Sequence, residues 1–163
     1  MNVKKLTSLS VSVALAMVLS FIESQIPPLV AVPGVKIGLS NIVTVFLLYT
    51  LGAREAGGVS LVRVALSSVL FGSSVSFIYS LSGAALSFLV MLFAKKLGVF
   101  SPVGVSVLGG VFHNVGQIIA ACIVMENAAI SVYLAPLVIS GVLAGIAVGV
   151  LAGILTKKLD GKI

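Results

Sequence analysis

Residues 75–94 read VSFIYSLSGAALSFLVMLFA, an uncharged run that is followed by the pair Lys95-Lys96. An apolar run of about 20 residues is long enough to cross the hydrocarbon core of a bilayer as an α-helix. Further runs of this kind occur on both sides of it, with one shorter run near Leu39–Leu51 and longer ones near Leu6–Ile26, Ala56–Phe71, Pro102–Met125 and Val132–Thr156. The sequence therefore predicts an all-α integral membrane protein.

The composition of the whole chain agrees with this prediction. Of its 163 residues, 60% are hydrophobic and 9% are charged, and the mean hydropathy is +1.30. A soluble globule of this size needs more polar side chains than that to cover its surface. Disordered chains, coiled coils and disulfide scaffolds have different compositions, and the lone Cys122 has no partner for an internal bridge. We expect one transmembrane domain over residues 1–163.

The basic residues predict how the chain is oriented. All of them except Lys36 and Arg63 fall before the first run, in every second loop or after the last run, if the short run also crosses: Lys4, Lys5, Arg54, Lys95, Lys96, Lys157, Lys158 and Lys162. Positive residues concentrate on the cytoplasmic side of membrane proteins. We therefore expect six transmembrane helices in a multi-pass protein of a prokaryotic cytoplasmic membrane, with both termini in the cytoplasm. The net charge of +6 is spread over these clusters, so nucleic-acid binding is not expected.

Three segments break the apolar pattern. Pro27–Lys36 contains three of the five prolines, so it predicts an outer loop or a re-entrant cap. The segments Gly72-Ser73-Ser74 and Ser80-Leu81-Ser82-Gly83 are expected to loosen the turn between the third and fourth helices. Together with the short run near Leu39–Leu51, they are typical of backbone that borders a solvated cavity.

Small residues recur at helical spacing in the first and last runs. Small residues allow membrane helices to approach closely, so both stripes predict helix packing. Either stripe is also a candidate surface for docking a separate membrane subunit. The two stripes are Ser8, Ser12, Ala16 and Ser20 in the first run, and Gly141, Gly145, Gly149 and Gly153 in the last.

Arg63 is the clearest ionisable residue inside a predicted membrane helix. It lies nine residues after Arg54, which places it near mid-membrane at about 1.5 Å per residue. A charge there is costly unless it is paired or hydrated, and a guanidinium group suits a carboxylate or phosphate. Two roles for Arg63 are compatible with this position: an internal ion pair with Glu23, and a site for an anionic ligand. Both could hold if the ligand displaces Glu23 from Arg63.

The fifth run carries His113, Asn114 and Gln117, which are too polar to face lipid and are expected to face the interior. They either join helices through hydrogen bonds or line a ligand cavity. With a single histidine in the chain, a zinc or iron site is not expected. The chain also lacks a phosphate-binding loop and an aspartate-rich cluster, and its four acidic residues are scattered. We expect neither an enzyme nor a bound cofactor.

Several of these motifs together resemble a known family. They are Phe21-Ile22-Glu23-Ser24 with Pro27-Pro28, the stretch from Pro33 to Val43, Arg63, Leu70-Phe71-Gly72-Ser73, Ser80-Leu81-Ser82-Gly83 and the stretch from Gly109 to Gln117. The chain resembles the Gx transporters, also described as heptaprenyl diphosphate synthase component I, which are related to the substrate-binding S components of energy-coupling factor transporters. The resemblance extends over nearly the whole chain.

The resemblance implies a bundle of six helices that binds a vitamin or precursor from outside and pairs with a transmembrane T subunit and two ATPase subunits. In such proteins an Ala-x-x-x-Ala stripe on the first helix meets the T subunit. The matching positions here are Ser12, Ala16 and Ser20, with serine at two of the three.

The hypothesis from the sequence is a membrane subunit that captures a small, anionic or amphipathic solute. Lys36 and Arg63 would attract its negative group, while hydrogen bonds would come from Asn41, Ser82, His113, Asn114 and Gln117. The alternatives are a membrane accessory subunit of heptaprenyl diphosphate synthase and a stand-alone secondary transporter. The synthase name hints at an isoprenoid or quinone-related solute.

Overall fold

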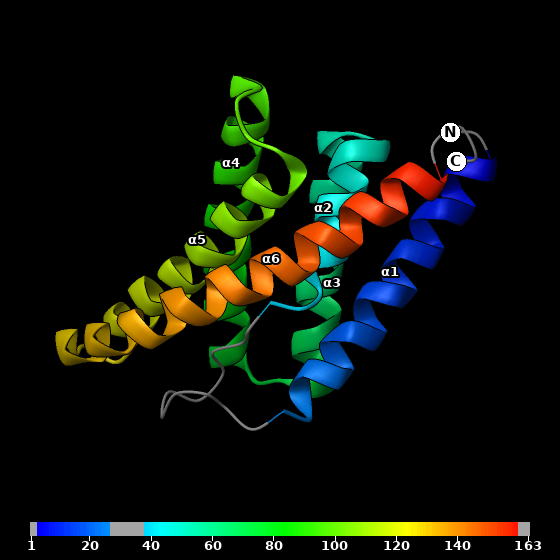
Figure 1. Cartoon of the computed structure of the whole chain (residues 1–163). Coiled ribbons are helices and arrows are strands. Elements are labelled where there is room, and N and C mark those ends of the chain that lie inside the picture. Colours follow the sequence, from blue (N-terminus) through cyan, green and yellow to red (C-terminus); the bar gives the residue numbers. More distant parts are fainter. Residues whose placement is uncertain (1–2, 27–37, 160–163) are drawn as a thin grey trace.

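The computed structural model describes residues 3–26 and 38–159, and this part of the chain is a bundle of helices (Figure 1). Its elements are α1 (Val3–Ser24), α2 (Asn41–Thr50), α3 (Ala53–Phe71), α4 (Ser74–Leu97), α5 (Pro102–Val124), the 3₁₀-helix η1 (Ala128–Tyr133) and α6 (Leu134–Leu159). The predicted all-α class is confirmed, and the described residues form six α-helices as expected. That all six cross the membrane stays a prediction. The loop predicted over Pro27–Lys36 lies wholly outside the described residues.

Four helical segments of the described chain are long and apolar enough to cross a membrane: α1, α4, α5 and the stretch Ala128–Lys158. These segments make the chain a multi-pass membrane protein. Helix α3 carries Arg54, Glu55 and Arg63, and α2 has only 10 residues. At about 1.5 Å per residue, α2 covers roughly 15 Å, half of a hydrocarbon core. The predicted cytoplasmic location of both termini stays a prediction.

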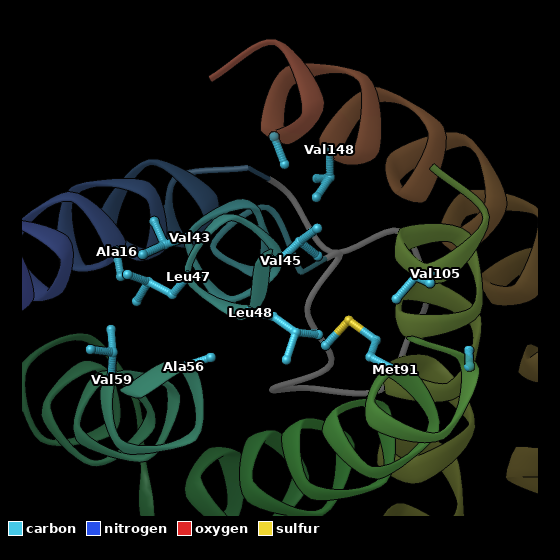
Figure 2. Packing of buried hydrophobic residues seen from close by; sticks show 12 residues of the cluster. Ala16, Val43, Val45, Leu47, Leu48, Ala56, Val59, Met91, Val105 and Val148 are labelled. Atoms are coloured by element: carbon cyan, nitrogen blue, oxygen red, sulfur yellow. The ribbon is translucent and has the colours of Figure 1, made fainter. Parts of the chain in front are cut away.

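Helix α2 is the centre of the apolar core. Its side chains pack against residues of every other α-helix, as Figure 2 shows for Leu47 and Leu48. No residue of α2 is exposed. The longer helices instead expose large apolar side chains, such as Leu15 on α1 and Leu143 on α6, as expected of surfaces that face lipid.

Lys95 satisfies the C-terminal end of α2. Its ammonium group donates a hydrogen bond to the carbonyl oxygen of Leu48 at 2.5 Å and lies 4.8 Å from the ring centroid of Tyr49. Backbone carbonyls in the last turn of a helix lack partners within the helix, and positive charge is favourable there. A lysine near the end of α4 therefore stabilises the C-terminal end of the short helix α2.

A second lysine that bonds to a neighbouring helix joins α1 to α3. Lys5 forms an ion pair with Glu55, in the first turn of α3. Hydrogen bonding to Lys5 holds the pKa of the Glu55 carboxyl below its usual value. The pair links the beginnings of the two helices.

Helices α5 and α6 cross at contacts between their backbones, and the two lie side by side in Figure 1. A Cβ added at Gly110 would overlap the carbonyl oxygen of Gly141. A Cβ at Gly145 would lie 2.6 Å from Cα of Val107, and one at Gly149 would lie 2.7 Å from Cα of Val103. These glycines of the α6 stripe therefore allow the close approach that small residues provide between membrane helices.

The fourth glycine of that stripe behaves differently. A Cβ at Gly153 would meet nothing within 4 Å. The close contact between the α6 glycine stripe and the backbone of α5 therefore ends at Gly149, although the sequence pattern continues through Gly153.

The small residues of α1 face into the bundle. Ser12, Ala16 and Ser20 are buried within this chain, and Ala16 lies beside Val43 and Leu47 of α2 (Figure 2). In this structure the stripe packs α1 against the bundle. A role for the same residues at a T-subunit interface stays a prediction.

One expectation from the sequence is wrong. The segment Ser80–Gly83 does not loosen the turn between α3 and α4, because it lies inside the continuous helix α4. Only Gly72 and Ser73 separate the two helices, and Ser73 accepts a hydrogen bond from the amide of Ser76 as the cap of α4. Gly83 serves helix packing instead, since a Cβ there would lie 2.7 Å from the carbonyl oxygen of His113.

We predict that Gly110→Ala destabilises the protein by about 1–3 kcal/mol, because the added methyl group collides with backbone and not with a movable side chain. The free energy of unfolding, measured by titration with a denaturing detergent, tests this. Gly153→Ala is the matched control, and we expect it to be neutral or to stabilise by up to about 1 kcal/mol through helix propensity. Equal effects of the two substitutions would contradict the packing described above.

We also predict that Lys95→Met destabilises the protein by about 1–2 kcal/mol, since the end of α2 loses its charged hydrogen-bond donor. Lys96→Met, the same change at the exposed neighbouring position, is expected to have little effect. Thermal unfolding of the two variants in the same detergent compares them. A larger loss for Lys96→Met would show that Lys95 does not support α2.

Candidate functional site

Buried polar side chains come from five of the helices. In a membrane helix such groups turn inward, because lipid offers them no hydrogen bonds. They are Ser12, Ser20 and Glu23 of α1, Asn41 and Thr44 of α2, Ser60, Arg63, Ser67 and Ser68 of α3, Ser76, Ser80 and Ser87 of α4, and Ser106, His113, Asn114 and Gln117 of α5.

Gly38, which precedes α2, joins three of these helices. Its amide donates a hydrogen bond to Oε1 of Glu23, at the end of α1. A Cβ on Gly38 would lie 3.5 Å from Cδ2 of His113 and 3.9 Å from Nδ2 of Asn41. Its φ of 91° is in the left-handed region that favours glycine. Glu23, Asn41 and His113 therefore converge on one backbone position.

Arg63 supplies the buried positive charge of this region. Only 3% of the residue is exposed, and the carboxylate of Glu23, itself 5% exposed, attracts it electrostatically. Within the part of the chain that the structure describes, Nη2 of Arg63 has no hydrogen-bond partner. A buried guanidinium nitrogen without an acceptor is costly, and an oxyanion is the partner that suits it best.

His113 and Gln117 lie on the face of α5 that packs against α4. Gly83 makes room for both, since a Cβ there would lie 3.2 Å from Cε1 of His113 and 2.8 Å from Cγ of Gln117. Both side chains are almost completely buried. Imidazole and amide groups thus line the α4 side of the same interior.

Asn41 extends the polar region from α2 to α4. Its amide nitrogen lies 3.4 Å from Oγ of Ser87, which donates a 2.8 Å hydrogen bond to the carbonyl oxygen of Gly109. The contact orients the Asn41 side chain toward the interior, next to Gly38 and His113.

Asn114 points in another direction. Its Nδ2 donates a 2.6 Å hydrogen bond to the carbonyl oxygen of Leu137, and it lies beside Gly141. Both partners belong to α6. Asn114 therefore joins α5 to α6, the role that the sequence offered as the alternative to ligand binding, and does not contact the group around Gly38.

Two further residues that the sequence predicts to bind the ligand are Ser82 and Lys36. Ser82 is half-buried on α4, and a Cβ on Gly116 would lie 2.7 Å from its carbonyl oxygen. Its backbone thus borders α5. Lys36 lies outside the described residues. The structure brings together Glu23, Asn41, Arg63, His113 and Gln117.

The sequence reading missed the polar face of α4. Ser76, Tyr79, Ser80 and Ser87 are buried there. They are spaced three, one and seven residues apart, as on one face of a helix. The sequence does not reveal this face if the segment from Ser80 to Gly83 is expected to be irregular. Gly38 was missed as well, since its role depends on a contact across the fold.

The described residues contain no group of three or more His, Cys, Asp or Glu side chains that could hold a metal ion. The chemistry available at the site is therefore that of one guanidinium group, one carboxylate, two amides and one imidazole. Such a set can bind an oxyanion through charge and fix its orientation through hydrogen bonds.

A family model described as heptaprenyl diphosphate synthase component I matches residues 12–155 of this chain. The match extends from the middle of α1 to the last turns of α6, and it includes Glu23, Gly38, Asn41, Arg63, His113 and Gln117. No curated protein and no solved structure matches the chain significantly.

We predict that Asn114→Ala lowers the free energy of unfolding by about 0.5–1.5 kcal/mol, because the carbonyl of Leu137 loses one buried donor and keeps only the Ser140 hydroxyl among its side-chain donors. Binding of an anion at Arg63 should be unchanged, since Asn114 contacts α6. Denaturation and ligand binding of the same purified variant test both statements. If the variant lost anion binding but kept its stability, Asn114 would be a ligand-binding residue and not a link between helices.

Proposed function

This chain belongs to the heptaprenyl diphosphate synthase component I family, and we propose that it is the substrate-binding membrane subunit of an energy-coupling-factor-type uptake transporter. In this proposal it captures from outside a small anionic or amphipathic solute, such as a vitamin or an isoprenoid or quinone-related precursor. A T subunit and ATPase subunits supply the energy, as in the transporters to which S components belong.

The observation that carries the proposal is the buried guanidinium group of Arg63. It is 3% exposed, and one of its nitrogens has no acceptor among the described residues. A merely structural arginine in a membrane bundle is expected to have its donors satisfied by the protein, because unpaired buried groups destabilise the fold. An open donor at a buried charge supports a site that a ligand completes.

The neighbouring groups support a ligand with a polar end. Asn41 and His113 lie beside Gly38, and His113 and Gln117 border Gly83. Amide and imidazole groups provide direction but no net negative charge, so they complement the charge of Arg63 without cancelling it.

A second candidate function is favoured by the description of the family itself. It names a component of heptaprenyl diphosphate synthase, which suggests a membrane accessory subunit that assists a separate catalytic chain. Affinity purification of the full chain from its native membrane separates the two candidates. Recovery of a soluble prenyl synthase whose product formation changes on binding favours the accessory subunit, and recovery of a membrane subunit with ATPases favours the transporter.

We predict that Arg63→Gln abolishes retention of an anionic small molecule by the purified chain. Losing a buried charge-assisted contact typically costs at least tenfold in affinity. Native mass spectrometry of the gently extracted protein should show the bound solute on the wild type and not on the variant. Arg63→Lys keeps the charge but loses the planar fork, so an intermediate loss is expected.

The matched control is Arg54→Gln, the same change at an exposed residue at the start of α3. It should retain the solute as the wild type does. The proposal is wrong if Arg63→Gln folds normally and still retains the same solute at the same occupancy.

A further inference from the structure

Glu23 is a buried carboxylate at the end of α1, and it interacts with two other segments of the bundle. One oxygen, Oε1, accepts a hydrogen bond from the backbone amide of Gly38. The charge of the group also attracts Arg63. The carboxylate is therefore held by the backbone of one segment while it compensates a charge on another.

The guanidinium group of Arg63 does not use all of its hydrogen-bond donors within the described chain. A closed pair between arginine and carboxylate uses two parallel hydrogen bonds from the guanidinium fork. Here Nη2 lacks any hydrogen-bond partner in the described chain. Glu23 thus lowers the cost of burying the positive charge but leaves at least one donor open.

This arrangement has a consequence for any anion that reaches Arg63. The charges of Glu23 and Arg63 sum to zero by themselves, which is the favourable state for buried groups. An oxyanion bound to Arg63 adds a second negative charge close to Glu23, and like charges in a poorly solvated interior repel strongly.

We propose that Glu23 is a resident counter-anion that competes with the ligand for Arg63 and thereby keeps ligand binding reversible. The inference rests on the proposed function, since it assumes that an anion binds at Arg63, and it assigns a role to a residue that need not touch the ligand. The hydrogen bond from Gly38 gives the carboxylate a second partner when the ligand takes over Arg63. The ligand group is an oxyanion, either a carboxylate or a phosphate.

Glu23→Gln separates the charge of this residue from its structural contact. The amide oxygen of glutamine accepts a hydrogen bond from Gly38 as the carboxylate does, but it carries no charge. The variant therefore keeps the link between α1 and the start of α2 while it removes the competitor. Glu126→Gln is the matched control, because it makes the same change at an exposed residue after α5.

The experiment measures binding of two probes, inorganic pyrophosphate and butyrate, to the full chain in lipid nanodiscs by calorimetry. We expect Glu23→Gln to bind one of them at least tenfold more tightly than the wild type and to release it more slowly. Glu126→Gln should match the wild type. Preference for pyrophosphate assigns a phosphate-bearing ligand, and preference for butyrate assigns a carboxylate.

The outcomes distinguish this inference from the proposed function. If Arg63→Gln abolishes binding but Glu23→Gln binds no more tightly than the wild type, Glu23 is not a competitor and only this inference fails. If Arg63→Gln binds both probes as the wild type does, the proposed function fails as well. Absence of binding of both probes to folded Glu23→Gln also overturns the inference.

A measurement on the wild type covers the case in which Glu23→Gln does not fold. The chain has three glutamates, Glu23, Glu55 and Glu126, so ¹³C-labelled glutamate gives three carboxylate resonances. Glu55→Gln and Glu126→Gln assign two of them, and Glu23 follows by elimination. We expect the preferred probe to shift the Glu23 resonance and leave the others in place, and an unchanged Glu23 resonance contradicts the inference.

Discussion

The structure depends on one constraint: polar groups within lipid must find their partners inside the protein. Every buried polar side chain of the described chain faces the interior of the bundle, where Glu23, Asn41, Arg63 and His113 come from four different helices. In water, this arrangement would compete with solvation of the same groups. In lipid that alternative is absent, so the few polar residues determine which faces of the helices turn toward each other.

Close packing around α5 makes this convergence possible. Gly83 of α4 and Gly141 of α6 contact two different sides of α5. Because the two neighbours approach the backbone of α5 so closely, consecutive residues of one helix have different partners. His113 faces α4, whereas Asn114 bonds to α6. One face of α5 thus belongs to the polar interior, and another belongs to the helix interface.

Much of the fold was accessible from the sequence, because hydropathy and length report directly on burial in lipid. The six helices, the inward orientation of Arg63 and the tight approach of α6 follow from local patterns. The different partners of His113 and Asn114 do not follow from such patterns, because they depend on which neighbouring helix each face of α5 contacts. The role of Gly38 depends on a contact with Glu23 that is 15 residues away, and serine-rich Ser80–Gly83 looked irregular although α4 continues through it. Local composition does not encode such pairings across the bundle.

The short helix α2 has a consequence for how the protein adapts to its bilayer. A helix of 10 residues in contact with lipid would create a large hydrophobic mismatch, which membranes relieve by local thinning. Here no residue of α2 is exposed, and Lys95 occupies its C-terminal end. The short helix is therefore enclosed by the protein, and the exposed apolar side chains of the described α-helices belong to longer ones, as with Leu15 of α1 and Leu143 of α6. Membranes of different thickness would act on the tilt of those outer helices, while the polar interior is insulated from that change.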